Sequence, residues 1–107
     1  MQGWLQPFRI IIPLIFVVSG YSSAESGTDI FKRRCAGCHG ANGAGDTTIG
    51  KHLKVRDLRS PEVQKQSDEE LAAIISKGTS GKMPAFESKL NKEQIEDVVK
   101  LIRTLKR

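Results

Sequence analysis

The two cysteines of this 107-residue chain both lie in one short stretch, Cys35-Ala36-Gly37-Cys38-His39. On a helix, Cys35, Cys38 and His39 stand at i, i+3 and i+4, so two thiols and an imidazole share one face within about one turn. C-x-x-C-H is the spacing of c-type haem attachment, in which the thiols add to the haem vinyl groups and the imidazole reaches the iron. We therefore expect Cys35 and Cys38 to attach one haem c covalently, and His39 to be an axial ligand.

Three other interpretations of the same residues stay open. A thioredoxin-like redox pair calls for a βαβ context and a helix N-terminus that lowers a thiol pKa, and neither is visible. A zinc site built from Cys35, Cys38 and the histidines lacks the two separated ligand pairs of structural zinc. The third is chance juxtaposition. A disulfide between the two cysteines closes a loop too small to restrain the unfolded chain much, so stapling explains the motif poorly.

A second axial ligand has few candidates within residues 25–107. Met83 is the only methionine there, and His52 is the only other histidine. Pro84 restricts Met83 to an extended backbone and Gly81 lets the chain turn, so this loop can present a thioether to the haem. Met83 could instead be an ordinary loop residue, and His52 could be an exposed residue or the replacement ligand.

Ligation by histidine and methionine predicts the type of chemistry. Methionine raises the reduction potential of haem iron, and two axial side chains leave no position open for a substrate. We therefore expect a single-electron carrier with no catalytic residues and no substrate turnover of its own. The alternative class is a haem enzyme, peroxidase-like, or a gas sensor in which Met83 moves away from the iron.

Residues 1–24 have the pattern of a secretory signal peptide. Arg9 is their only charged residue, residues 10–18 form an apolar centre, and Ser22-Ser23-Ala24 supply small residues at the cleavage site. We expect export to the periplasm and a mature domain of residues 25–107. An uncleaved N-terminal anchor is the alternative, although the apolar run is shorter than the roughly 20 residues that span a bilayer.

Helical periodicity and capping residues predict an all-α domain of three main helices and one short helix. The first starts near Gly27, capped by Thr28 or Asp29, and runs into the cysteine motif. The remaining helices start at Ser60, at Ser67 and at Asn91, and residues 40–59 and 79–86 are expected to be loops. The expected apolar faces are Ile30 and Phe31, then Leu71, Ile74 and Ile75, and finally Ile95, Val98, Val99, Ile102 and Leu105.

The core that these faces can form is small. Within the mature domain of about 83 residues, Phe31 and Phe86 are the only aromatic side chains. Domains of this size are marginally stable by burial alone and usually need a disulfide, a metal or a large bound group. A long loop at residues 40–59 is also unusual unless it wraps something. Both features favour a buried prosthetic group.

Several segments together resemble a small single-haem class I cytochrome c of the bacterial cell envelope, over residues 27–105. Gly27-x-x-x-Phe31-x-x-x-Cys35 resembles the first helix of that family, residues 82–86 resemble its methionine loop, and residues 98–105 resemble its closing helix. The resemblance implies the cytochrome c fold. It also implies that Cys35 and Cys38 form the thioethers, that His39 is the proximal ligand and that Met83 is the distal one.

Two positions depart from the family pattern. Leu101 stands where the last helix often carries an aromatic residue, so Phe31 has an aliphatic partner. The loop at residues 49–58 has no proline whose carbonyl could accept the ring N–H of the proximal histidine. The carbonyl of Lys51 or of Arg56 could serve instead.

The charge distribution suggests the partners. The whole chain carries a formal net charge of +5, which becomes +4 without the signal segment. Basic side chains precede the motif, lie in the following loop and flank Met83; they are Lys32, Arg33, Arg34, Lys51, Lys54, Arg56, Arg59, Lys77 and Lys82. Such a set is either simply solvated or steers redox protein donors and acceptors with acidic docking faces.

Other partners are less compatible with the sequence. Nucleic acid is not expected, because the mature chain lacks base-stacking aromatics and is exported. A membrane is expected only through partner complexes or an uncleaved signal. A dedicated electron-entry subunit of a larger oxidoreductase remains a third functional class.

Overall fold

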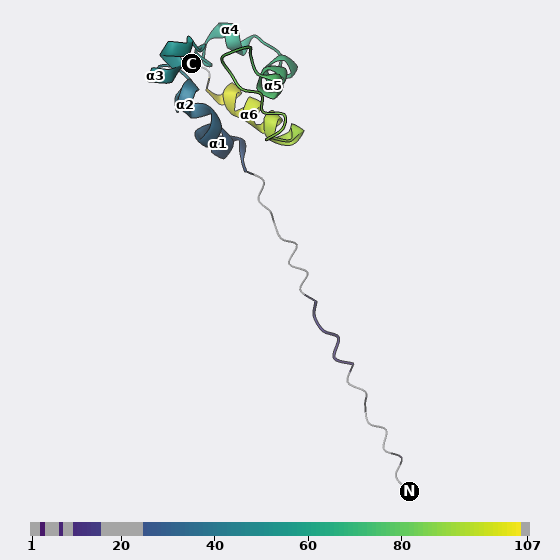
Figure 1. Ribbon diagram of the computed structural model, residues 1–107. Coiled ribbons are helices and arrows are strands. Elements are labelled where there is room, and N and C mark those ends of the chain that lie inside the picture. Colours follow the sequence, from purple (N-terminus) through teal and green to yellow (C-terminus); the bar gives the residue numbers. More distant parts are fainter. Residues whose placement is uncertain (1–2, 4–6, 8–9, 16–24, 106–107) are drawn as a thin grey trace.

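The computed structural model describes Gly3, Pro7, residues 10–15 and residues 25–105 (Figure 1). Most of the expected signal segment, residues 1–24, therefore lies outside the described residues. Residues 10–15 are extended, and their large apolar side chains are exposed. Among the residues that the structure describes, no helix combines the length and the hydropathy needed to cross a bilayer.

The described part of the chain contains helices and no strand. The elements are α1 (Gly27–Ile30), a π-helical turn η1 (Phe31–Cys35), α2 (Ala36–His39), α3 (Thr48–Leu53), α4 (Pro61–Gln64), α5 (Asp68–Lys77) and α6 (Lys92–Thr104). The all-α prediction is confirmed. The prediction of three main helices and one short helix was incomplete, because α3 lies inside the expected loop of residues 40–59.

Side-chain caps explain where most of these helices begin. Ser26 is the N-cap of α1, and its hydroxyl accepts the Asp29 N–H, so the prediction of Thr28 or Asp29 as the cap was wrong. Ser26 has extended backbone dihedrals, as an N-cap requires, whereas Thr28 and Asp29 are already helical. The predicted caps at Ser60, Ser67 and Asn91 are confirmed.

Helix α3 escaped prediction because it has no apolar stripe. Its N-cap is Thr47, whose hydroxyl accepts the Gly50 N–H at 2.8 Å. Ile49 is 54% exposed, and the buried residue of the helix is Gly50, which adds no side chain to a periodic pattern. Hydrophobic periodicity therefore cannot find this helix, although its cap can be identified.

Helices α1 and α6 cross at very close range (Figure 1). A Cβ atom at Gly27 would stand 2.3 Å from the Asp97 carbonyl oxygen and 3.1 Å from the Val98 nitrogen. Only glycine allows this approach. The crossing fixes the start of the helical run that leads to Cys35 and His39.

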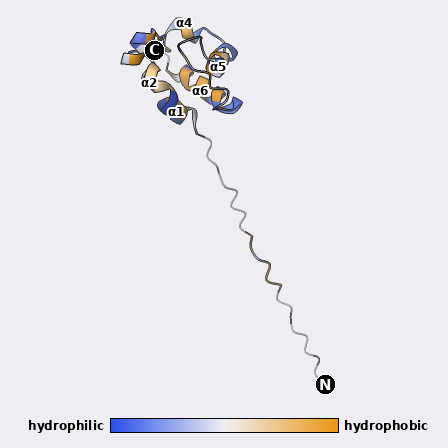
Figure 2. Ribbon diagram, in the orientation of Figure 1, coloured by the Kyte–Doolittle hydropathy of each residue, from blue (hydrophilic) through white to orange (hydrophobic). Residues whose placement is uncertain are grey.

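The core lies between this helical run, α5 and α6, and Figure 2 shows hydrophobic stretches along the ribbon of α6. Its buried members are Ile30, Phe31, Leu58, Val63, Leu71, Ile75, Phe86, Leu90, Ile95, Val98, Val99 and Ile102. The predicted apolar faces are thus largely confirmed. Ile74 and Leu105 are only half-buried.

Two long polar side chains tie the segment around α4 to the last helix. The Gln64 amide donates to the Leu58 carbonyl at 2.8 Å and to the Ile102 carbonyl at 3.0 Å. Arg103 donates to the Gln64 carbonyl at 2.8 Å and to Asp68 at 2.9 Å. These bonds supply donors to the Leu58 and Gln64 carbonyls, and they add a second donor to the Ile102 carbonyl, which also accepts the Leu105 N–H.

Candidate functional site

The cysteine motif sits at the end of a helical run with one wide turn. The Ala36 N–H donates to the Phe31 carbonyl, five residues earlier, so the helix is π-helical immediately before the motif. Cys35 then caps α2, with φ −114° and ψ −38°. The expected continuous helix is present, but with this extra residue in one turn. Such π turns are frequent at functional sites.

The structure brings the two predicted thiols within one helical turn. Cys35 and Cys38 are both free and half-buried. Burial raises the pKa of the Cys35 thiol to about 11, although the nearby Arg34 lowers it and Cys38 raises it slightly further. The Cys35 thiol is therefore neutral at physiological pH, which is unlike the lowered pKa of a thioredoxin-type nucleophile.

His39 follows directly and carries a buried polar atom without a partner. Its Nδ1 atom is buried and makes no hydrogen bond, which is unusual for a buried polar group. Burial also lowers the pKa of His39, which favours the neutral imidazole with a free lone pair.

The structure does not join His39 to either of the two loop carbonyls that the sequence offered as acceptors. The Lys51 carbonyl accepts the Lys54 N–H at 3.3 Å. The Arg56 carbonyl packs on Gly45, where a Cβ atom would stand 3.3 Å from it. Neither oxygen accepts a hydrogen bond from His39 Nδ1.

The backbone of the motif is held by residues that the sequence did not single out. The Thr47 hydroxyl donates to the Cys38 carbonyl at 2.8 Å, and the Gly45 N–H donates to the His39 carbonyl at 2.7 Å. Gly50 lies directly on the same segment, because a Cβ atom there would stand 2.4 Å from the Cys38 carbonyl oxygen. The sequence did carry one signal for this contact, because the spacing Thr47-x-x-Gly50 is that of a helix N-cap.

Met83 lies in the loop between α5 and α6, as predicted. It is half-buried and packs against the core cluster, which Cys35 also contacts from the helical run. A shallow hollow of about 300 Å³ opens beside it, lined by Thr79, Gly81, Lys82, Met83 and Pro84. His52, the competing candidate, is exposed on α3.

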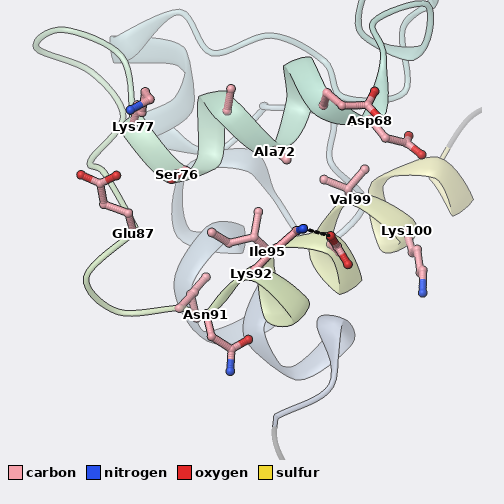
Figure 3. Close-up of a pocket in the computed structure, with 14 residues that line it drawn as sticks. Asp68, Ala72, Ser76, Lys77, Glu87, Asn91, Lys92, Ile95, Val99 and Lys100 are labelled. Atoms are coloured by element: carbon pink, nitrogen blue, oxygen red, sulfur yellow. Dashed lines mark ion pairs between the residues drawn. The ribbon is translucent and has the colours of Figure 1, made fainter.

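A larger hollow lies elsewhere, in a groove between α5 and α6 (Figure 3). Its floor includes Ala72, Ile95 and Val99, and its rim is charged, with a Lys92–Glu96 ion pair at 3.9 Å. None of the cysteine motif residues or Met83 lines it. Because the groove contains none of the residues expected to hold a haem, we place the candidate site at the cysteine motif and not in the groove.

The residues at the motif fit a covalently attached haem. Two free thiols one turn apart can form two thioethers, and the half-buried imidazole next to them, whose pKa is lowered by burial, can bind a metal. Over the described residues, no three His, Cys, Asp or Glu side chains gather as a metal site of their own.

Most of the basic residues around the motif are exposed. Lys32, Arg33 and Arg34 stand out from η1, and Lys51, Lys54 and Arg56 from α3 and the chain after it. Arg33 forms an ion pair with Glu25.

Arg59 does not belong to this exposed basic set. It donates to Asp57 through two side-chain nitrogens, at 3.0 and 3.1 Å, and this hydrogen bonding raises the pKa of Arg59. The side chain of Ile49 is also exposed on α3, close in sequence to the exposed Lys51 and Lys54, and adds an apolar spot to this surface.

Comparison with known proteins agrees with this chemistry. A family model described as "Cytochrome C oxidase, cbb3-type, subunit III" matches residues 22–102. Cytochrome c6 of Nostoc sp. (strain PCC 7120 / SAG 25.82 / UTEX 2576) is 40% identical over 79 residues, which are 72% of this chain and 66% of that protein. Cytochrome c6 of Leptolyngbya boryana is 34% identical over 79 residues, which are 72% of this chain and 86% of that protein. Among solved structures, the KustC0563 c-type cytochrome matches with a TM-score of 0.73 and 32% identity, over 78% of this chain and 100% of that chain.

Proposed function

The chain belongs to the class I c-type cytochromes, and from this we propose that it is a periplasmic single-electron carrier with one histidine and one methionine ligand to its iron. It carries covalently bound haem c, the cofactor of this family. In our proposal, the residues that hold the haem are Cys35, Cys38, His39 and Met83. The observation that carries the assignment is the pair of free thiols within one helical turn, with the His39 imidazole directly after them.

Each residue has a defined task in this proposal. Cys35 and Cys38 fix the porphyrin to the helical run through thioether bonds, so the cofactor cannot dissociate. His39 is held by the hydrogen bond from Gly45 to its carbonyl, which keeps the imidazole at the end of α2. Met83 supplies the second ligand from its loop. The haem contributes reversible one-electron chemistry at its iron.

Two side-chain ligands favour electron transfer over catalysis. With His39 and Met83 both bound to the iron, little would need to reorganise on reduction, and no position would be open to peroxide or oxygen. A haem enzyme or gas sensor would require Met83 to move away. Carbon monoxide tests this alternative: rapid and complete binding to the reduced protein without denaturant would favour it.

The exposed cations suggest how partners are met. Helix α3 contacts the motif segment through Gly50 and Thr47, so its exposed Lys51 and the following Lys54 lie near the expected haem site. An acidic redox partner would be attracted to this face, and salt would weaken the attraction. Ile49 can add desolvated apolar contact once the proteins have met.

One segment before the domain supports the proposed export to the periplasm. Residues 10–15 expose five large apolar side chains, which a folded domain in water would normally bury. A segment that is read by the export machinery and then removed has no need of such burial.

The central experiment compares spectra of the matured wild type, Met83→Ala and His52→Ala. We expect Met83→Ala to lose the sulfur-to-iron charge-transfer band and to gain a high-spin, ligand-accessible iron, whereas His52→Ala keeps the wild-type spectrum. If Met83→Ala keeps its spectrum and His52→Ala does not, the ligand assignment is wrong. Purified protein whose mass shows no added haem would end the proposal altogether.

A second candidate function is that of an electron-entry subunit bound to a larger oxidoreductase. The matching family model is described as a subunit of a cytochrome oxidase, which favours this candidate. Size-exclusion chromatography of native extract separates the two: a free carrier elutes near its own mass of 11.8 kDa or below, and a subunit elutes with the complex.

A further inference from the structure

The loop that carries Met83 is closed at its base by hydrogen bonds to the end of α5. The Gly78 N–H donates to the Ile74 carbonyl at 2.8 Å, and the Phe86 N–H donates to the Ile75 carbonyl at 3.0 Å. The chain thus leaves α5 at Gly78 and returns to it at Phe86. These bonds fix the two ends of the loop but not the residue near its tip.

Inside the loop, three hydrogen bonds converge on Thr79. Its N–H donates to the Met83 carbonyl at 2.9 Å, and its hydroxyl accepts the Met83 N–H at 3.1 Å. Its carbonyl accepts the Lys82 N–H at 3.3 Å, which closes a turn with Gly81 at φ +76°. Thr79 therefore holds both backbone groups of Met83, one of them through its side chain.

The carbonyl of Met83 also rests directly on Gly78. A Cβ atom at Gly78 would stand 2.4 Å from that oxygen, and φ of Gly78 is +69°. The backbone of Met83 is thus fixed on one side by contact. On the other side it depends on the Thr79 hydroxyl, because Met83 is only half-buried and its neighbours Ser80, Gly81, Lys82 and Pro84 are exposed.

We propose that Thr79 is a positioning residue for Met83, and that its hydroxyl keeps the thioether in place against competing ligands. This inference rests on the proposed function, in which Met83 is the axial ligand. Loss of the hydroxyl leaves the Met83 N–H without its acceptor. It therefore favours conformations in which the Met83 thioether has left the iron. A ligand that binds only those conformations then binds more tightly, in proportion to their population.

The test is an imidazole titration of the ferric, matured protein, followed by loss of the sulfur-to-iron charge-transfer band. Thr79→Val keeps the side-chain shape and removes the hydroxyl, and we expect it to bind imidazole about fivefold more tightly, the effect of one lost hydrogen bond. Thr79→Ser keeps the hydroxyl and should remain within about twofold of wild type. Equal affinities of Thr79→Val and wild type would overturn the proposal.

The chain offers a matched control in Thr104. Its hydroxyl also bonds to a backbone group, the Leu101 carbonyl at 2.6 Å, but on α6. Thr104→Val therefore removes the same chemical group far along the chain from the methionine loop, and it should leave imidazole binding unchanged. If Thr104→Val increases the affinity as much as Thr79→Val does, the effect is one of general stability and the positioning role is refuted.

A measurement on the wild type keeps the proposal testable even if Thr79→Val does not fold. Amide hydrogen exchange of Met83 should be at least about tenfold slower than that of Ser80, whose N–H has no hydrogen bond among the described residues. Equal exchange rates would overturn the proposal. Met83→Ala separates the proposed ligand role of Met83 from the positioning role of Thr79. If Met83→Ala alters the spectrum while Thr79→Val does not alter imidazole binding, only the role of Thr79 fails.

Discussion

Replacing Gly27 by alanine should test the close crossing of α1 and α6. The added Cβ atom would stand 2.3 Å from the Asp97 carbonyl oxygen and 2.6 Å from its carbon, so both clashes are with backbone. The two helices must separate by about 1 Å to reach ordinary contact, and overpacking of this kind costs about 1–3 kcal/mol. Alanine regains less than about 1 kcal/mol of helix propensity at this first helical position.

The expected net result is a loss of about 2 kcal/mol in the free energy of unfolding. In a domain of this size, that loss lowers the melting temperature by roughly 10 °C. Guanidinium chloride unfolding of the matured protein, followed by far-ultraviolet circular dichroism, measures it directly. Thr28→Ala, at the exposed neighbouring position of the same helix, is the matched control and should change stability by less than about 0.5 kcal/mol.

A free energy for Gly27→Ala within about 0.5 kcal/mol of wild type would refute the reasoning. It would mean that the helices can separate without cost and that the crossing does not position the motif. A loss in Thr28→Ala equal to that in Gly27→Ala would also refute it, because the cause would then be the helix and not the contact.

Three further changes test other parts of the structure. Asn91→Ala removes the side chain that accepts the Gln94 N–H at 2.9 Å in the capping box of α6, and unfolding by denaturant should show a loss of about 1 kcal/mol. Arg103→Leu leaves the Gln64 carbonyl without its donor and should cost about 2 kcal/mol in the same assay; no loss would show that water replaces the guanidinium. Lys51→Glu should slow electron transfer to an acidic partner about threefold at low ionic strength, and less at high salt. Lys92→Glu makes the same charge change on the rim of the α5–α6 groove and should not slow electron transfer. If both variants slow it equally, the effect comes from the net charge of the protein and not from a docking face around α3.

The sequence predicted the local patterns of the chain better than the contacts between distant segments. The C-x-x-C-H spacing depends only on neighbours along the chain, and the structure keeps Cys35, Cys38 and His39 within one turn. The capping serines and the apolar stripe of α6 are also local patterns, and the structure confirms them.

What could not be predicted depends on contacts between distant segments. Helix α3 has no stripe because its buried residue, Gly50, packs by being small. The direction of the Lys51 and Arg56 carbonyls follows from the fold of the loop, and no propensity encodes it. The π turn before Cys35 likewise adds a residue without any local signal such as proline.

The His39 side and the Met83 side of the proposed iron site are held in different ways. The carbonyls of Cys38 and His39 receive hydrogen bonds from Thr47 and Gly45, which lie in the following loop at the start of α3, so the motif cannot loosen unless that loop also moves. Met83 is hydrogen-bonded to Thr79 within its own exposed loop.

Local opening begins where contacts are few and hydrogen bonds are exposed to water. The methionine should therefore leave the iron at a lower denaturant concentration than the one that unfolds the helices, while the thioethers and His39 stay in place. Loss of the charge-transfer band before the loss of circular dichroism would show this order, and coincident transitions would mean that the loop and the helices form one cooperative unit.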